Sequence, residues 1–150
     1  MKLRIPPLLL LLITGSMMTL LAHLFPEPGI PWPYPKNLAG LAALVGITFL
    51  ALGVADFRKQ KTTVNPLKPQ EASALVTTGI YSRTRNPMYV GMLLLLAAWW
   101  ILLQNLAAAI FLPIFMGLIN RLQIVPEEEI LRKSFGEPYI LYCRNVPRWL

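Results

Sequence analysis

Charged residues are scarce in this chain of 150 residues: they make up 14% of it, well below the usual quarter for a soluble protein, while 55% is hydrophobic. Water is therefore not expected to be its main solvent. The one cysteine, Cys143, excludes an internal disulfide and any multi-cysteine metal site, and we predict no metal site. The one histidine, His23, is expected at a membrane interface. A glycine-rich dinucleotide loop is missing, which excludes a Rossmann-type fold.

The net charge of +7 does not indicate nucleic-acid binding in this composition. Nucleic-acid-binding proteins place their Lys and Arg residues on a solvated face, whereas here these residues flank apolar runs. That arrangement is typical of the cytoplasmic loops of membrane proteins, and it adds attraction to anionic lipid head groups. We therefore predict membrane lipids as partners and no nucleic acid.

Long apolar runs predict an all-α fold, a polytopic membrane protein with four transmembrane helices that forms a single domain over residues 1–150. Each run approaches the roughly 20 residues needed to cross a hydrocarbon core. Only Gln104 and Asn105 separate the last two runs, so these must form a tight antiparallel hairpin. The first run follows Lys2 and Arg4, as a signal peptide would, but it is longer than a typical signal sequence and is expected to remain as a span. The four predicted spans are 8–25, 38–55, 88–103 and 106–125.

The distribution of Lys and Arg predicts the orientation of these spans. Basic residues gather before the first span, between the second and third, and after the fourth, whereas the loop between the first two carries only Lys36. Both termini and the central loop are therefore expected in the cytoplasm. The proline-rich loop 26–37 is predicted to be non-helical, with Trp32 and Tyr34 in the head-group layer. Small residues in the second span predict close approach of a neighbouring helix: Ala39, Ala42, Ala43, Gly46 and Gly53.

Two cytoplasmic segments, 62–91 and 126–148, are more specialised than connections require. The first returns to the membrane through Arg85, Asn86 and Pro87. Asn86 is a good helix N-cap and Pro87 a good first helical residue, so this pair has a purely structural explanation. The alternative is that these residues belong to a binding site at the start of the third span.

The second segment begins at Pro126, which we expect to open a helix. Glu127, Glu128 and Glu129 would occupy its first turn, where the helix dipole favours acids by about 0.3 to 1 kcal/mol each. Capping is one explanation of the acids. The other is cation binding beside a negatively charged leaflet. An aromatic stripe interrupted by Gly136 predicts two short C-terminal cytoplasmic helices, and its members are Leu131, Phe135, Tyr139 and Tyr142.

Two sequence runs, GIYSRTRNPMYVG and EEEILRKSFGEPYILYCRNVP, lie in this order around the predicted hairpin. Together they resemble the isoprenylcysteine carboxyl methyltransferases and their prokaryotic and phospholipid-methyltransferase relatives, over residues 62–148. The resemblance implies an integral membrane enzyme that transfers a methyl group from S-adenosylmethionine and releases S-adenosylhomocysteine. It also implies a cytoplasmic cofactor pocket formed by the last spans and the C-terminal helices, a lipophilic small molecule or lipid as acceptor, and a prokaryotic inner membrane as location.

The chemistry of this cofactor suggests roles for the matching residues. Glu127 and Glu128 would accept hydrogen bonds from ribose hydroxyls or the ammonium group, while Arg85 and Asn86 suit the carboxylate. Aromatic and aliphatic side chains would enclose the adenine, and Gly91 would allow close approach. The cofactor-binding residues implied by the resemblance are Leu75, Val76, Gly79, Tyr81, Asn86, Pro87, Met88, Tyr89, Gly91, Glu127 and Glu128.

Arg85 and Arg121 are the predicted catalytic residues, with the role of orienting the acceptor. Relatives that methylate a carboxylate place an arginine shortly before the acidic pair, and here Arg121 and Gln123 compete for that position. Two residues are about 200° apart around a helix, so they cannot serve the same role without a local distortion. Asn86 stands where many relatives have histidine, and it cannot titrate near pH 7.

The sequence leaves several alternatives open. A phospholipid N-methyltransferase is the alternative within the enzyme class, and the acceptor and the methylated atom are undetermined. A small transporter or a membrane scaffold is the alternative from another class. Transport of ions usually requires an ionisable residue at mid-membrane, and the four predicted spans place their formal charges at or beyond their ends. The oligomeric state is not indicated.

Overall fold

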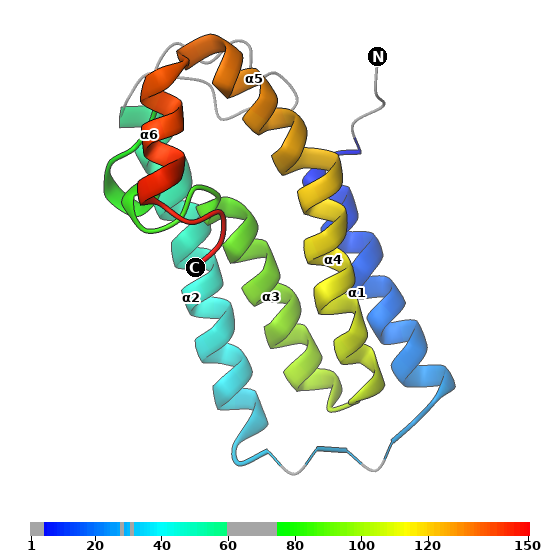
Figure 1. Cartoon of the computed structure of the whole chain (residues 1–150). Coiled ribbons are helices and arrows are strands. Elements are labelled where there is room, and N and C mark those ends of the chain that lie inside the picture. The colour runs from blue at the N-terminus through cyan, green and yellow to red at the C-terminus, as the bar shows by residue number, and fades with distance from the viewer. Residues whose placement is uncertain (1–4, 28, 31, 60–74) are drawn as a thin grey trace.

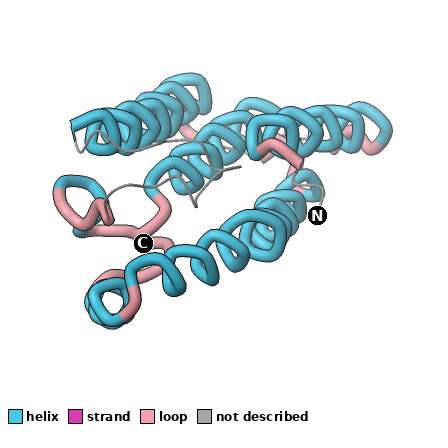
Figure 2. The backbone as a smooth tube through the Cα atoms, turned by 90° about the horizontal axis from the view of Figure 1, so that it is seen from above, coloured by secondary structure: helices cyan, strands magenta, loops and turns pink. Residues whose placement is uncertain are grey.

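The computed structural model describes residues 5–27, 29–30, 32–59 and 75–150, and all regular structure in these residues is helical (Figures 1 and 2). The prediction of an all-α fold is confirmed. Lys2, Arg4, Lys61 and Lys68, used above for orientation, lie outside the described residues, as do residues 62–74 of the first motif segment. The elements are α1 (Pro7–Leu24), α2 (Pro35–Lys59), η2 (Gly79–Ser82), α3 (Pro87–Leu103), η3 (Ala107–Ile110), α4 (Phe111–Ile119), η4 (Asn120–Ile124), α5 (Val125–Phe135) and α6 (Glu137–Asn145).

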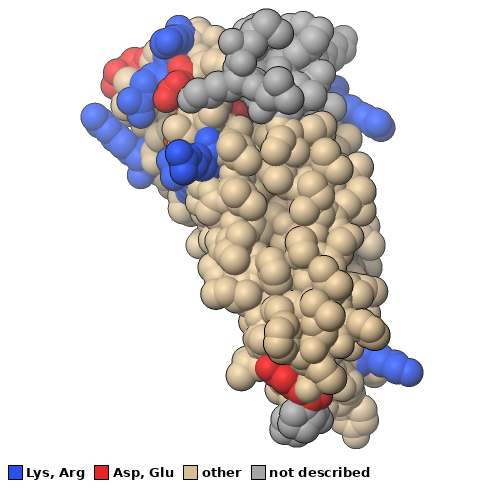
Figure 3. All heavy atoms as spheres, turned by 90° about the vertical axis from the view of Figure 1, so that its right-hand side faces the viewer, with Lys and Arg blue, Asp and Glu red and all other residues tan. Residues whose placement is uncertain are grey.

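The long helices alternate in direction, so the start of α1, the end of α2 and the start of α3 lie at the same end as α5 and α6 (Figure 1). We call this the cap end. Three helical stretches of the described residues are long and apolar enough to cross a membrane: Pro7–Leu24, Pro35–Lys59 and Ala107–Phe135. The fourth, Pro87–Leu103, is apolar but shorter. Figure 3 shows a long band without charged residues between charges at the two ends. These features support a multi-pass integral membrane protein.

Small residues bring α2 and α3 into close contact, as the sequence predicted. Ala39, Gly46 and Gly53 of α2 are buried. A Cβ added at Gly46 would lie 2.9 Å from the carbonyl oxygen of Gly91, and one added at Gly91 would lie 2.6 Å from that of Gly46. Contacts below 3.0 Å are not tolerated by real Cβ atoms, so both positions require glycine at this helix spacing.

The connection between α3 and the fourth helix is the tight turn that was predicted. Gln104 ends α3 in the left-handed conformation, with φ of 50°. Asn105 is 2% exposed, and its Oδ1 accepts a hydrogen bond from the Ala108 N–H at 2.9 Å while its Nδ2 donates to the Phe25 carbonyl at 2.8 Å. This side chain therefore caps the next helix and ties the turn to the end of α1.

α5 begins at Val125 with Pro126, Glu127 and Glu128 in its first turn, as expected, but no gap separates it from the fourth helix, so the expectation of two separate helices is wrong. Helical structure is continuous over Ala107–Phe135, with a π-helical stretch at Asn120–Ile124 that ends two residues before the proline. Proline lacks an N–H and crowds the carbonyl four residues earlier, so the preceding turn must widen or break. Consequently the three acids lie within a longer helix and do not occupy a free helix N-terminus.

Two short helices form the cap, as the aromatic stripe predicted. Gly136, with φ of 58°, separates α5 from α6. Tyr139, Tyr142 and Val146 form a small buried cluster. Partly buried residues that pack against this cluster are Leu75, Leu131, Phe135 and Cys143. The cluster holds α6 against the segment that leads into α3.

Candidate functional site

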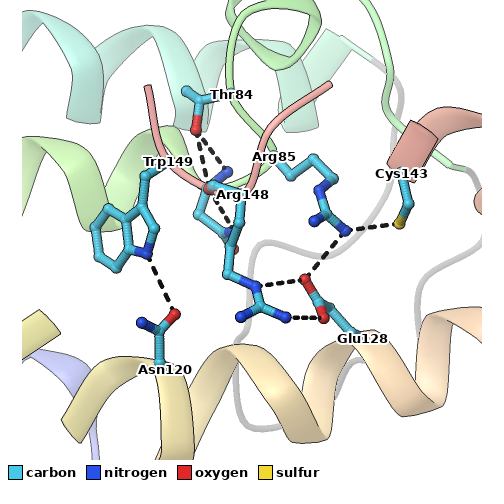
Figure 4. Close-up of polar contacts among 8 residues, drawn as sticks. Thr84, Arg85, Asn120, Glu128, Cys143, Arg148 and Trp149 are labelled. Carbon is cyan, nitrogen blue, oxygen red and sulfur yellow. Dashed lines mark hydrogen bonds and ion pairs between the residues drawn. The ribbon is translucent and has the colours of Figure 1, made fainter. Parts of the chain in front are cut away.

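The start of α3 is held by the segment 146–150, which follows α6 and which we call the post-α6 segment. The Arg85 N–H donates to the Pro147 carbonyl at 3.0 Å. The Arg148 carbonyl accepts from Thr84 Oγ1 at 3.2 Å and from Asn86 Nδ2 at 2.9 Å (Figure 4). Asn86 is the N-cap residue of α3 by position, as predicted, but its side chain makes no capping hydrogen bond. It binds the post-α6 segment instead.

Glu128 lies between two guanidinium groups (Figure 4). Its Oε1 is 3.1 Å from Arg85 Nη1 and accepts from Arg148 Nε at 3.0 Å, and its Oε2 accepts from Arg148 Nη2 at 2.7 Å. Paired donors on one carboxylate are among the stronger hydrogen-bond arrangements in proteins. The hydrogen bond to Glu128, ahead of the opposing effect of burial, raises the pKa of Arg148. The acid of α5, the arginine before α3 and the post-α6 segment thus form one charged cluster.

Arg85 has further polar capacity in this cluster. Its side chain is 14% exposed, and Nη1 also donates to Cys143 Sγ of α6. Its Nε is buried and has no hydrogen-bond partner among the described residues. Because Arg85 shares Glu128 with Arg148, it retains donor capacity that suits an additional anionic group.

A second acid contacts the first turn of α3. The Tyr89 hydroxyl donates to Glu127 Oε1 at 2.8 Å, and Tyr89 is buried. One turn earlier, Gln123 is 1% exposed; its Nε2 donates to the Ile5 carbonyl at 2.6 Å, and its Oε1 has no partner among the described residues. Glu129, in contrast, is exposed. Two of the three acids therefore face the start of α3.

Three buried tyrosines lie near the charged cluster. Tyr81 stacks edge-on against Phe57 of α2 with ring centroids 5.1 Å apart, and its carbonyl accepts from the Tyr142 hydroxyl at 2.7 Å. Burial, followed by the nearby Tyr142, Glu127 and Asp56, raises the pKa of Tyr81. Burial is also the main cause that raises the pKa of Tyr139 and of Tyr142. These hydroxyls are therefore neutral at physiological pH, where they offer hydrogen bonds without adding charge.

The predicted site residues fall into separate groups in the structure. Four of them meet at the charged region: Arg85, Tyr89, Glu127 and Glu128. Two face α2: Met88 packs on Gly53, and Gly91 packs on Gly46 and Leu50. Gly79 lies against Asp56, and Pro87 is a buried first residue of α3. Leu75 packs on the tyrosine cluster of the cap, and Val76 is buried. Arg121 is exposed on the π-helical stretch. Arg121 and Gln123 could serve the same role only if the helix were locally distorted, and the π-helical stretch is such a distortion. Of the two residues, Gln123 is buried and Arg121 is exposed.

Several residues of this region were not singled out as site residues from the sequence. Asp56, near the end of α2, accepts a hydrogen bond from the Ile80 N–H at 2.9 Å. Asn120 accepts from Trp149 Nε1 at 3.2 Å, which fixes the post-α6 segment to the π-helical stretch. The only available signal for Asp56 was its position as a lone acid at the end of an apolar run. No sequence signal indicates the pairing of Asn120 with Trp149.

Comparison with known proteins finds relatives of this sequence that include methyltransferases. An uncharacterized protein of Haemophilus influenzae is 43% identical over 63 residues, which are 42% of this chain and all of that protein. Protein-S-isoprenylcysteine O-methyltransferase B of Arabidopsis thaliana is 28% identical over 109 residues, 68% of this chain and 55% of the relative. The corresponding enzyme of Schizosaccharomyces pombe is 33% identical over 73 residues, 49% of this chain and 31% of the relative. The chain thus spans about half or less of these two enzymes.

No solved structure matches the chain. The family model described as phospholipid methyltransferase matches residues 36–138, a range that begins in α2 and ends in α6. It therefore includes Arg85, Tyr89 and the acids of α5, which the structure brings together. The chain belongs to the phospholipid methyltransferase family and is distantly homologous to the isoprenylcysteine O-methyltransferases.

Proposed function

We propose that this protein is an S-adenosylmethionine-dependent methyltransferase that acts on a lipophilic acceptor at the cytoplasmic face of a membrane. The observation that carries the proposal is the meeting of two distant segments: Glu127 and Glu128 of α5 contact Tyr89 and Arg85 at the start of α3. Between them the chain runs along α3, through a tight turn and back along the fourth helix. Together with family membership, this favours a cofactor site at the cap end.

The residues present fit the charges of the proposed cofactor. S-adenosylmethionine supplies a methyl group bound to a sulfonium, and it carries an ammonium, a carboxylate and ribose hydroxyls. Glu127 and Glu128 offer carboxylate oxygens to the cationic and hydroxyl groups. Arg85, with its buried Nε lacking a partner among the described residues, offers a donor to the carboxylate. A site with both signs of charge suits a zwitterion better than a simple ion.

The remaining residues would align the acceptor and exclude water, because direct methyl displacement needs no covalent enzyme intermediate. The buried Tyr81, Tyr139 and Tyr142 keep their protons and present apolar rings. A dry, preorganised site strengthens the electrostatic contacts made by Arg85 and the two acids. In this proposal Arg85 orients reactants and stabilises charge, and it does not act as a base.

One observation favours a particular kind of acceptor within this function. Gln123 is buried with its Oε1 unpartnered among the described residues, whereas Arg121 is exposed. An amide oxygen accepts hydrogen bonds, so it suits an amine or hydroxyl better than a carboxylate. The second candidate is therefore a phospholipid N-methyltransferase, with an amino head group as acceptor.

We also propose that α3 crosses the membrane with the other three helices, which gives four spans with the cap end in the cytoplasm. Its 17 residues rise about 26 Å, slightly less than a hydrocarbon core of roughly 30 Å. It lies antiparallel to α2 and α4 in the bundle (Figure 1). Starting from Cys143→Ser, an impermeant maleimide added to sealed cells should label a single cysteine at Asn37→Cys but not one at Ser134→Cys. Labelling of both from one side would contradict this topology.

The function is tested by calorimetric titration of the detergent-purified protein with S-adenosylhomocysteine. We expect saturable binding that weakens at least tenfold in Glu127→Gln and Glu128→Gln, because each loses a charged hydrogen-bond acceptor. Glu129→Gln is the matched control, since Glu129 is exposed in the same helix. A transporter or scaffold would show no heat of binding. If all three variants bound S-adenosylhomocysteine with wild-type affinity, Glu127 and Glu128 would not be part of the site.

The acceptor is identified separately in membranes. Membranes with and without the protein are supplied with S-adenosylmethionine that carries a deuterated methyl group, and extracted lipids are compared by mass spectrometry. Label in an amino head group would support the phospholipid N-methyltransferase. Label on an acidic or thiol-bearing isoprenoid would support the other acceptor class.

A further inference from the structure

Asp56 carries an interaction that the proposed function leaves unexplained. It lies in the last turn of α2, its side chain is 12% exposed, and its Oδ2 accepts the Ile80 N–H at 2.9 Å. The preceding residue, Gly79, has φ of 64°, and any Cβ there would collide with the Asp56 carboxylate. The carboxylate and the η2 turn (Gly79–Ser82) therefore fit each other closely.

Asp56 does not stabilise its own helix. An acid in the last turn is opposed by the helix dipole, and burial of a carboxylate is costly unless it is well paired. Lys59 is 3.8 Å away and 78% exposed, so this ion pair contributes little. The Ile80 N–H is thus the main partner of this partly buried carboxylate among the described residues. The interaction fixes the η2 turn, and the helix gains nothing from it.

The η2 turn connects α2 to the charged region. Phe57, next to Asp56, stacks on the Tyr81 ring, and the Tyr81 carbonyl accepts from Tyr142 of α6. Tyr81 in turn lies close enough to Glu127 for that acid to contribute to its raised pKa. Any shift of the turn would therefore move Tyr81 relative to Tyr142 of α6.

We propose that Asp56 is a positioning residue of the cofactor site: by holding the Ile80 N–H, it fixes the η2 turn and places Tyr81 against Tyr142 of α6. This gives the end of α2 a role in the site beyond membrane anchoring. The inference rests on the proposed function, because the affected quantity is cofactor affinity. Asp56 acts through Tyr81 and does not itself contact the cofactor.

The test measures S-adenosylhomocysteine affinity of the full chain in detergent by calorimetry, with thermal unfolding followed in parallel. Asp56→Ala should bind about tenfold more weakly, since the hydrogen bond that holds the turn is lost. Asp56→Asn should bind within threefold of wild type, because its amide oxygen still accepts from the Ile80 N–H. Lys59→Ala is the control, and its affinity should equal that of wild type.

A rescue by Asn separates a positioning role from a charge effect. Equal losses in Asp56→Ala and Asp56→Asn would overturn the proposal. So would a fall in unfolding temperature for Asp56→Ala with unchanged affinity, which is the signature of a purely structural residue. Absence of binding by the wild type would refute the proposed function itself. Binding by wild type and Asp56→Ala with equal affinity would refute only this inference.

A second measurement needs no variant and covers the case in which Asp56→Ala fails to fold. Amide hydrogen exchange of the peptide containing Ile80 is compared in the wild type with and without saturating S-adenosylhomocysteine. Exchange should slow by at least tenfold on binding if the turn is coupled to the site. Unchanged exchange in a protein that binds the compound would overturn the proposal.

Discussion

Replacement of Glu128 by glutamine should release the post-α6 segment from the start of α3. The carboxylate holds Arg148 through two donors and Arg85 through a third, over distances of 2.7 to 3.1 Å. Hydrogen bonds to charged groups contribute about 1.5 to 3 kcal/mol each. Gln keeps one acceptor oxygen but turns an NH₂ group toward a guanidinium. Because Arg148 is 37% exposed, solvent offsets part of the loss.

We therefore expect the cap contact to weaken by about 2 kcal/mol, which corresponds to about 30-fold in an opening equilibrium. Native-state hydrogen exchange measures this directly. The Arg85 N–H bonds the Pro147 carbonyl, so its exchange reports release of the post-α6 segment. That amide should exchange about 30-fold faster in Glu128→Gln, while amides in the middle of α3 keep their protection.

Glu129→Gln removes the same charge from the adjacent, exposed position and should change this rate less than threefold. Uniform acceleration across the whole of α3 would mean global destabilisation and not local release. An unchanged rate at Arg85 in Glu128→Gln would show that the charged cluster does not hold the segment, and the reasoning above would fail.

Three further predictions concern packing, the turn and pH. Gly91→Ala should lower stability by roughly 1 to 3 kcal/mol in thermal unfolding, because its Cβ would meet the α2 backbone. Gly117→Ala, with open space around it, should be neutral or stabilising. Equal effects of the two substitutions would refute the close α2–α3 contact. Asn105→Ala should lower the free energy of unfolding by roughly 2 to 3 kcal/mol, because both hydrogen bonds of the side chain are lost. Asn105→Asp should lower it less, since Asp keeps the hydrogen bond from Ala108 but loses the donor to Phe25. Identical losses in the two variants would contradict these separate roles. Stability should fall as pH rises above about 10, because folding raises the pKa values of Tyr81, Tyr139 and Tyr142, whereas the unfolded chain lets them ionise at ordinary values. Tyr142→Phe should make the free energy of unfolding, measured by chemical denaturation, fall less steeply with pH. An unchanged pH dependence in this variant would contradict the prediction.

The helices were predictable from the sequence because long apolar runs leave few alternatives in lipid. The predicted spans agree with the observed helices to within a few residues at most ends. The continuation through Pro126 was not predicted, because a proline followed by acids has the composition of a helix start. The π-helical stretch accommodates the proline, and that solution depends on tertiary packing around Gln123 and Asn120.

The candidate site was predictable in part. A tight hairpin necessarily returns the acids to the start of α3, so the contacts of Arg85 and Tyr89 follow from topology. Helical geometry also explains why Met88 and Gly91 do not lie beside Tyr89 and Glu127. Met88 and Gly91 are three residues apart and share the face of α3 that packs on α2, while Tyr89 lies about 100° around the helix from Met88. Direct cofactor contact at Met88 or Gly91 stays a prediction.

The partner of Asn86 could not be predicted from local sequence. Asn before Pro at a helix start indicates capping, yet the side chain donates to the Arg148 carbonyl, 62 positions away along the chain. Asp56 and Ile80 are likewise 24 positions apart. Contacts of this kind depend on how α2, α3 and the cap pack together, and no local periodicity records them.

Helical structure runs without a loop from Ala107 to Phe135, changing direction between α4 and α5 (Figure 1), and so links the apolar part of the fourth helix to the acids of the cap. Because no loop separates α4 from α5, tilting the fourth helix to match a thicker or thinner bilayer would displace Glu127 and Glu128 relative to Arg85. Acyl-chain length of the surrounding lipid is therefore a variable that enters any affinity measured at this site. Titrations with S-adenosylhomocysteine in nanodiscs of short-chain and long-chain lipids would measure this dependence, which a detergent micelle does not report.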